Sequence, residues 1–237
     1  MTRYSPALAA GALLGWGFGS RWLPVLPTRL DIMISSAVVL ALVAVMVWGM
    51  LPLRSLGWRL PLLTVAALAL AAVFIMAGWV PCANVAKIVG AAALGIWVAQ
   101  QLEQVSWAVV IAVVSAVVDI LSVAVGPTKA IVAHGPVVVG YFTLAITWAG
   151  YTYAEAFTGL GVSDVVFFAL YLAVALRFGL RVRATAVAMV ASFVATIALA
   201  ISATALPALP LLSAAFLLVN ADLLWRGGDD GGKMSAR

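Results

Sequence analysis

The sequence predicts an all-α protein that crosses a membrane several times, and three observations support this class. The chain has 237 residues, of which 66% are hydrophobic and only 9% are charged, whereas a soluble domain carries about 25% charged residues. Apolar runs of about 17–22 residues recur, a length that suits membrane-crossing helices rather than the roughly 10-residue strands of a barrel. Prolines, glycines and charges separate these runs. We therefore expect about eight transmembrane helices.

The N-terminal part, residues 1–104, is expected to hold four of them, over residues 5–21, 31–50, 60–79 and 85–100. The first is short and glycine-rich, which permits close helix contacts, and is interpreted as a retained helix rather than a cleaved signal peptide. Residues 81–84, Pro-Cys-Ala-Asn, are expected to form a tight turn. Lys87 follows near the start of the fourth helix, where its ammonium group is expected to reach the surface.

The C-terminal part, residues 105–226, is expected to hold the other four helices, over residues 105–125, 159–177, 184–205 and 209–225. Between the first two lies a segment of a different kind, whose apolar stretch 137–146 is too short to cross a membrane. Its β-branched and aromatic residues favour a strand or hairpin over a short extra helix at 136–153. The Gly/Asp-rich end, residues 227–237, is expected to be a disordered tail.

The basic residues predict an orientation. The net charge is +5, which in a membrane protein reports topology rather than nucleic-acid binding. Eight helices place both termini on one side, together with Arg3, Arg54, Arg59, Arg177, Arg181, Arg183, Arg226, Lys233 and Arg237. The other side receives Arg21, Arg29, Lys87 and Lys129. By the positive-inside rule, the termini are expected in the cytoplasm.

Cysteine and histidine usage argues against a zinc site. Cys82 is the single cysteine and His134 the single histidine, so the chain offers neither an intrachain disulfide nor a zinc ligand set. We expect no cofactor. The sequence gives no oligomeric state.

Two aspartates inside predicted membrane helices are the strongest candidates for functional residues. Asp119 stands in the helix 105–125 and Asp164 in the helix 159–177. A carboxylate at the middle of a membrane helix costs roughly 2.5–3.5 kcal/mol on insertion scales. Asp119 lies about six residues before its helix ends and Asp164 about five after its helix begins, so both lie roughly 8–9 Å from the same membrane face. Two carboxylates at one depth on antiparallel helices can meet.

Such a pair can act on a peptide bond without a metal. When two acids share a site, one can be protonated while the other is ionised. The ionised acid can take a proton from water while the protonated one polarises a carbonyl, as in aspartic proteases. The residues alone leave two other roles open, a proton- or cation-coupled transporter and a polar contact between helices.

Three motifs resemble those of the presenilin and signal-peptide-peptidase family of intramembrane aspartyl proteases, the GxGD type. That family has Tyr-Asp in one helix, Gly-x-Gly-Asp in a later one and Pro-Ala-Leu at the start of the last. The corresponding stretches here are Val118-Asp119, Gly161-Val162-Ser163-Asp164 and Pro207-Ala208-Leu209. Their order and spacing agree over about residues 105–225. The residues after Asp119 resemble the family's prokaryotic members, which implies a prokaryotic plasma membrane.

The resemblance implies a function and a set of site residues. Asp119 and Asp164 would form the catalytic dyad, and the substrate would be a transmembrane or signal-peptide-like helix in the lipid bilayer. The implied substrate-binding residues are Gly161, Ser163, Pro207, Ala208 and Leu209. The strand-like segment 137–147 could pair with an unwound substrate by β-augmentation.

Two positions depart from the family pattern. Val118 replaces the tyrosine of the first motif and removes a hydroxyl beside Asp119. Ser163 replaces a glycine of the second motif and adds a hydroxyl that could bond Asp164. A non-proteolytic, presenilin-like binding protein therefore remains a third reading.

Overall fold

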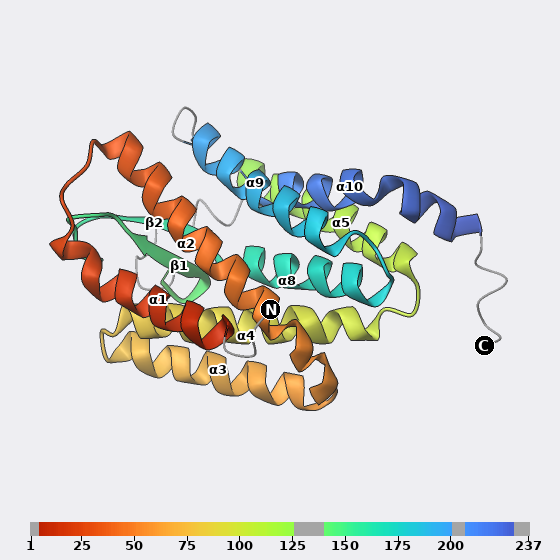
Figure 1. The fold of residues 1–237 in the computed structure, drawn as a ribbon, viewed down its shortest axis with the longest axis horizontal. Coiled ribbons are helices and arrows are strands. Elements are labelled where there is room, and N and C mark those ends of the chain that lie inside the picture. Colours follow the sequence, from red (N-terminus) through yellow and green to blue (C-terminus); the bar gives the residue numbers. More distant parts are fainter. Residues whose placement is uncertain (1–4, 126–139, 201–206, 230–237) are drawn as a thin grey trace.

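The computed structural model describes residues 5–125, 140–200 and 207–229. Within these ranges, eight helices of 15 to 23 residues make up most of the chain (Figure 1). They are α1 (Ser5–Gly19), α2 (Thr28–Met50), α3 (Arg59–Met76), α4 (Val80–Gln101), α5 (Val105–Val125), α8 (Val162–Arg177), α9 (Val182–Ala200) and α10 (Leu209–Asp229). The short 3-10 helices η1 (Ser20–Trp22) and η2 (Leu51–Leu56) follow α1 and α2. Each long helix overlaps one that the sequence predicts.

Five of these helical segments are long and apolar enough to cross a membrane, which makes this an integral membrane protein. They are Thr28–Leu56, Arg59–Met76, Val80–Gln101, Val105–Ser122 and Val182–Ala200. Helices α1 and α8 have 15 and 16 residues, fewer than the roughly 20 that a straight crossing needs. The prediction of an all-α membrane fold is confirmed, whereas a full set of eight crossings is not.

Helix α4 lies at the centre of the bundle, between α3 and α8. Small residues allow the close approach: a Cβ on Gly95 would lie only 2.8 Å from the backbone nitrogen of Leu170. On α8, the residues that follow this contact are fully or nearly fully buried. The α4–α8 interface is therefore a closely packed part of the interior.

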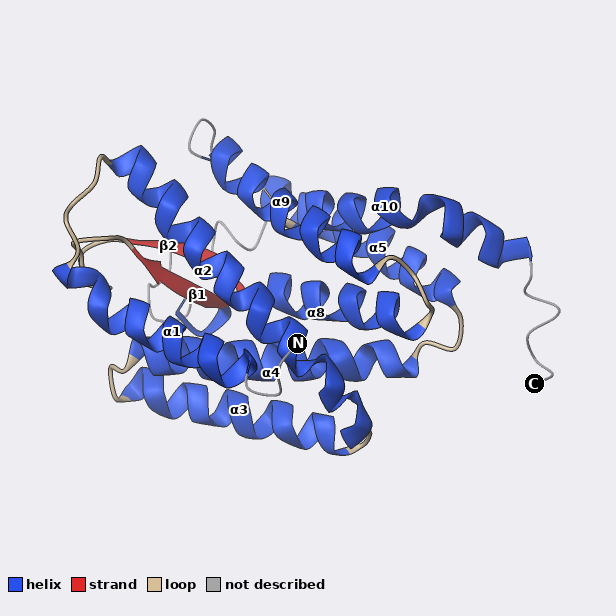
Figure 2. Cartoon of the chain, viewed as in Figure 1, coloured by secondary structure: helices blue, strands red, loops and turns tan. Residues whose placement is uncertain are grey.

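A two-stranded antiparallel sheet precedes α8 (Figure 2). Strand β1 (Thr143–Thr147) pairs with β2 (Phe157–Gly161), with Thr143 opposite Gly161 and Thr147 opposite Phe157. The hairpin between the two aspartate helices is confirmed, and the alternative helix at 136–153 is wrong for residues 143–147. Of the strand expected over 137–147, residues 140–142 are helical instead, and residues 137–139 lie outside the described ranges.

Three predicted boundaries differ from the structure. Residues 159–161 belong to β2 rather than to the next helix, since two glycines there weaken a helix by about 1 kcal/mol each relative to alanine. Residues 81–84 form the first turn of α4 rather than a separate turn, because proline is tolerated at the first helical positions. Helix α10 continues to Asp229, three residues into the expected tail, and residues 230–237 are not described.

Polar contacts join the helix ends at the end of the bundle away from the hairpin (Figure 1). Arg177 at the end of α8 donates to the carbonyls of Ala99 and Gln100, which end α4. Arg181 pairs with Asp222 of α10 at 2.7 Å. The bundle therefore has a basic end and a hairpin end.

Candidate active site

Asp119 contacts the Pro-Ala-Leu motif directly, although 90 residues separate it from Leu209. The Asp119 carboxylate on α5 accepts a hydrogen bond from the backbone N–H of Leu209, with an Oδ2–N distance of 3.0 Å. Leu209 is the first residue of α10, and the first four N–H groups of a helix lack partners within it. Asp119 therefore caps α10 and holds the motif beside the first acidic side chain.

Asp164 lies in the first turn of α8 and is only 8% exposed. Its Oδ2 accepts a hydrogen bond from the backbone N–H of Gly161 at 3.1 Å. Gly161 ends β2 and is the N-cap residue of α8. A Cβ on Gly161 would lie 2.9 Å from Asp164 Oδ2, so a glycine is needed for this approach. The strand thus leads straight into the second acidic side chain.

The two aspartates lie toward the same end of α5 and α8, two helices that touch through the hydroxyls of Ser115 and Tyr171. Asp119 is half-buried and lies near the end of α5, whereas Asp164 is buried near the start of α8. The structure shows no direct hydrogen bond between these two side chains, and each accepts a backbone N–H instead. The two aspartates therefore share one end of the bundle, and each is held by the backbone of a different segment.

The two positions that depart from the family motifs both face outward. Val118 is 58% exposed, so its side chain points away from the acid pair. Ser163 is also exposed, and the structure shows no hydrogen bond from its hydroxyl to Asp164. The expected Ser163–Asp164 contact is therefore not formed.

Pro207 and Ala208 are half-buried and lie just before α10. The carbonyl of Ala208 accepts the backbone N–H of Leu212 at 3.1 Å, which begins the helix. Residues 201–206, immediately before the motif, lie outside the described ranges. Among the motif's three residues, Leu209 is the one with a hydrogen bond to the acid pair.

A cluster of three buried hydroxyls lies deeper on the same three helices. The Tyr171 hydroxyl of α8 is 3.0 Å from Ser213 Oγ of α10 and 3.2 Å from Ser115 Oγ of α5. Ser115 and Ser213 are 3.4 Å apart. We call these three residues the hydroxyl triad. The sequence gives no sign of this triad, because single hydroxyls in apolar helices are common. Which hydroxyls face one another depends on how the helices pack, and this is known only from the structure.

Polar side chains from the N-terminal helices hold the outer edge of β1. Asn84 of α4 donates to the carbonyl of Ala145 at 2.7 Å and accepts its N–H at 3.2 Å. Lys87 is 3% exposed and donates to the carbonyl of Thr143 at 2.7 Å, and Trp16 donates to that of Thr147 at 3.1 Å. The expectation that Lys87 reaches the surface is wrong, since the strand carbonyls solvate its ammonium group in the interior.

The same pattern continues beyond the strand. Asp31 of α2 accepts the backbone N–H of Ala149 at 2.9 Å, and Ser20 donates to the carbonyl of Tyr151 at 3.2 Å. Every second residue from 143 to 151 is therefore held by a side chain of the N-terminal part. We call these five side chains, Lys87, Asn84, Trp16, Asp31 and Ser20, the β1 clamp.

The clamp leaves one open strand edge. The N–H and C=O of Ala145 both bond Asn84, so they point away from β2. In an antiparallel pair, when one of two opposed residues turns its N–H and C=O away from the partner strand, the other residue does the same. Gly159, opposite Ala145, therefore turns its N–H and C=O away from β1. Gly159 is exposed, and the structure shows no partner for these two groups in the described chain. The open edge of β2 runs toward Gly161 and Asp164.

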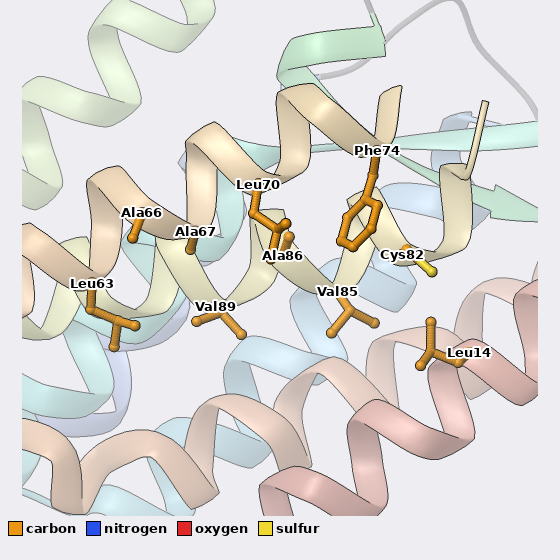
Figure 3. A pocket seen from close by; sticks show the side chains of 10 residues that line it. All are labelled: Leu14, Leu63, Ala66, Ala67, Leu70, Phe74, Cys82, Val85, Ala86 and Val89. Carbon is orange, nitrogen blue, oxygen red and sulfur yellow. The ribbon is translucent and has the colours of Figure 1, made fainter. Parts of the chain in front are cut away.

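An apolar pocket elsewhere in the bundle offers no comparable chemistry. It has a volume of about 390 Å³ and lies between α1, α3 and α4, where Leu14, Leu70, Phe74 and Cys82 line it (Figure 3). Elsewhere in the described ranges, no three His, Cys, Asp or Glu side chains gather in a way that could hold a metal ion.

The fold and the site together define an α-helical integral membrane protein with two acidic side chains at the hairpin end of its bundle. The chain matches no family model, no curated protein and no solved structure. Its function is therefore argued from its own residues.

Proposed function

We propose that the chain is an intramembrane aspartyl protease that hydrolyses peptide bonds in transmembrane or signal-peptide-like helices. One observation carries the proposal: Asp119 of α5 holds the backbone of Leu209, at the end of the bundle where Asp164 begins α8. Two acids and the start of α10, from three distant parts of the chain, thus lie at one end of the same three helices. A structural role for either aspartate alone would not require the other nearby.

The proposed chemistry needs one proton shared between the two acids. The ionised carboxylate removes a proton from a water molecule, whose oxygen attacks the carbonyl carbon of the substrate. The protonated acid gives its proton to the carbonyl oxygen, which forms a neutral tetrahedral intermediate. Collapse of this intermediate breaks the C–N bond: the acid that took the proton from water donates it to the leaving nitrogen, and the other acid takes a proton back from a hydroxyl of the intermediate. Both acids thus end each turnover in the protonation states in which they began it.

The open edge of β2 supports a route for the substrate. A helix must unwind before its peptide bonds become accessible, and an extended segment can then add to a free strand edge. The clamp occupies the edge of β1, the strand expected to receive it, so the substrate would pair with β2 instead. An added strand there would run past Gly161 to Asp164. The partners implied are the transmembrane peptide and the lipid bilayer around it.

A cleavage assay with isosteric variants tests the proposal. Asp119→Asn and Asp164→Asn each keep an oxygen for the backbone N–H that the aspartate accepts, so the two helix caps survive. Each variant should lower cleavage of a labelled transmembrane peptide in liposomes by about a hundredfold or more, because it removes a general acid–base group. Product is measured by mass spectrometry.

Asp222→Asn is the matched control, since it removes a surface carboxylate that pairs with Arg181 and should keep wild-type activity. Wild-type cleavage rates in both dyad variants would contradict a role of the acid pair in cleavage. If the wild-type protein itself does not cleave the peptide, a transporter or a non-proteolytic binding protein is the better reading, and proton or cation flux into the same liposomes would separate these two.

A further inference from the structure

We propose that the hydroxyl triad positions the acid pair by fixing the rotation of α5, α8 and α10 about one another. The inference rests on the proposed function and extends it to three residues outside the family motifs. Ser115, Tyr171 and Ser213 are 8%, 0% and 2% exposed. Each hydroxyl lies within 3.4 Å of the other two, so a single closed cluster ties the three helices together.

The helical spacing places the triad on the same faces as the site. Ser115 precedes Asp119 by four residues and Ser213 follows Leu209 by four, and residues four apart share a helix face. Tyr171 follows Asp164 by seven residues, two turns along the same face of α8. At 1.5 Å per residue, the triad lies about 6 Å from Asp119 and Leu209 along their helices. It is therefore the nearest polar layer beneath the acid pair on all three helices.

The orientation of the tyrosine is fixed by packing. Its ring stacks on Phe216 of α10 at a centroid distance of 4.7 Å and an angle of 11°. Both rings are fully buried. Since Phe216 and Ser213 belong to the same helix, α10 holds both the ring and the hydroxyl of Tyr171. Rotation of α10 would break these contacts and would also move the Leu209 N–H away from Asp119.

The triad is a positioning device rather than a part of the chemistry. Its hydrogen bonds run among its own three hydroxyls and to the carbonyl of Ala112, and none joins it to Asp119 or Asp164, so it does not exchange a proton with them directly. Catalysis by paired acids nevertheless depends on their relative placement, and a misplacement of about 1 Å can lower a rate by roughly a hundredfold. Loss of the triad should therefore affect turnover more than substrate binding.

Tyr171→Phe tests this role with minimal change in volume, because the ring can remain stacked on Phe216. We expect kcat for the labelled transmembrane peptide to fall by about tenfold or more, with KM within about twofold of wild type. Ser213→Ala should give the same pattern. Thr185→Val is the matched control: its buried hydroxyl joins α9 to α10 through Asn220 at 2.8 Å, far along α10 from the site, and its loss should leave kcat unchanged.

A second readout does not depend on catalysis. Spin labels on Val118→Cys and Ser163→Cys, two exposed positions beside the aspartates, report the α5–α8 separation in a Cys82→Ala background. Tyr171→Phe should broaden or shift this distance distribution, whereas Thr185→Val should not. An unchanged distribution in Tyr171→Phe overturns the positioning role, whether or not the protein cleaves peptides. If the distribution changes but wild type shows no cleavage, the proposed function fails while the triad's role in setting the helices stands.

Discussion

Gly161 links the strand, the helix and the second acid of the proposed dyad in one residue. It ends β2, caps α8 and donates its N–H to Asp164. Because its missing side chain leaves room for the Asp164 carboxylate, the constraint on this position is steric as well as polar. The need for a glycine at this position therefore follows from the short distance between a Cβ placed there and the Asp164 carboxylate.

Gly161→Ala should displace the Asp164 carboxylate, since the new Cβ would lie 2.9 Å from Oδ2 and 3.2 Å from Ser163 Oγ. We expect a loss of cleavage and a fall in the free energy of unfolding of about 0.5–2 kcal/mol, the usual effect of losing a helix cap. Gly159→Ala is the control, because its nearest neighbour would be at an ordinary 3.8 Å. Wild-type activity of Gly161→Ala would show that the Gly161 contact is dispensable.

Single residues were predictable from the sequence where their chemistry conflicts with a membrane. Asp119 and Asp164 stand out because a carboxylate in an apolar helix needs a reason. Lys87 and Asn84 gave a weaker signal: they lie three residues apart and so on one face of α4, but a lysine near a helix start has an easy alternative at the surface. Tyr171 gave none, since a tyrosine is at home in many membrane helices.

At the level of elements, the β1 clamp gives the N-terminal helices a task in the site. Strand β1 has five residues, and an isolated two-stranded hairpin is at best marginally stable. Side chains from α1 and α4 replace the missing third strand by meeting the backbone of Thr143, Ala145 and Thr147. The hairpin is therefore already formed without a substrate.

Asn84→Leu should loosen this hairpin, because it leaves the N–H and C=O of Ala145 buried without partners at about 1–3 kcal/mol for each such group. We expect faster amide hydrogen exchange over residues 143–147 and 157–161. The measurement is hydrogen–deuterium exchange with mass spectrometry in detergent micelles. Gln101→Leu, on the exposed end of the same helix, should leave exchange in the hairpin unchanged. Identical exchange in both variants would argue against the clamp.

The sequence predicted the helices more reliably than the segments that connect them. Apolar runs of about 20 residues define membrane helices strongly, and every long helix in the described ranges was expected. Residues 159–161 were assigned to the start of the helix 159–177 but belong to the strand Phe157–Gly161, because the two glycines among them disfavour a helix. Its pairing with β1 depends on contacts between distant residues, which local composition cannot reveal.

At the scale of the whole molecule, arginines gather at the end of the bundle that lies opposite the hairpin. Arg54, Arg59, Arg177 and Arg181 belong to the end opposite the hairpin, and the positive-inside rule assigns such an end to the cytoplasm. The acid pair would then lie toward the outer leaflet. A substrate would have to present its cleaved bond on that side.

Cysteine labelling tests this orientation. In a Cys82→Ser background, Ser55→Cys places a thiol at the basic end and Trp79→Cys places one at the hairpin end, and both positions are exposed. In intact cells, a membrane-impermeant maleimide should label the cysteine at 79 and not the one at 55. Permeabilised cells should show labelling of both. The reverse pattern in intact cells would place the basic end outside.

The closed edge of β1 also limits how copies of the chain can associate. Exposed strand edges are templates for aggregation, and a sheet with two of them can add neighbours without end. With α1 and α4 seated against β1, strand-to-strand joining between two molecules can proceed only through β2, and it uses up the single free edge of each. Such joining stops at a pair. The hairpin can therefore keep one strand edge free for binding without starting open-ended strand pairing between molecules in the membrane.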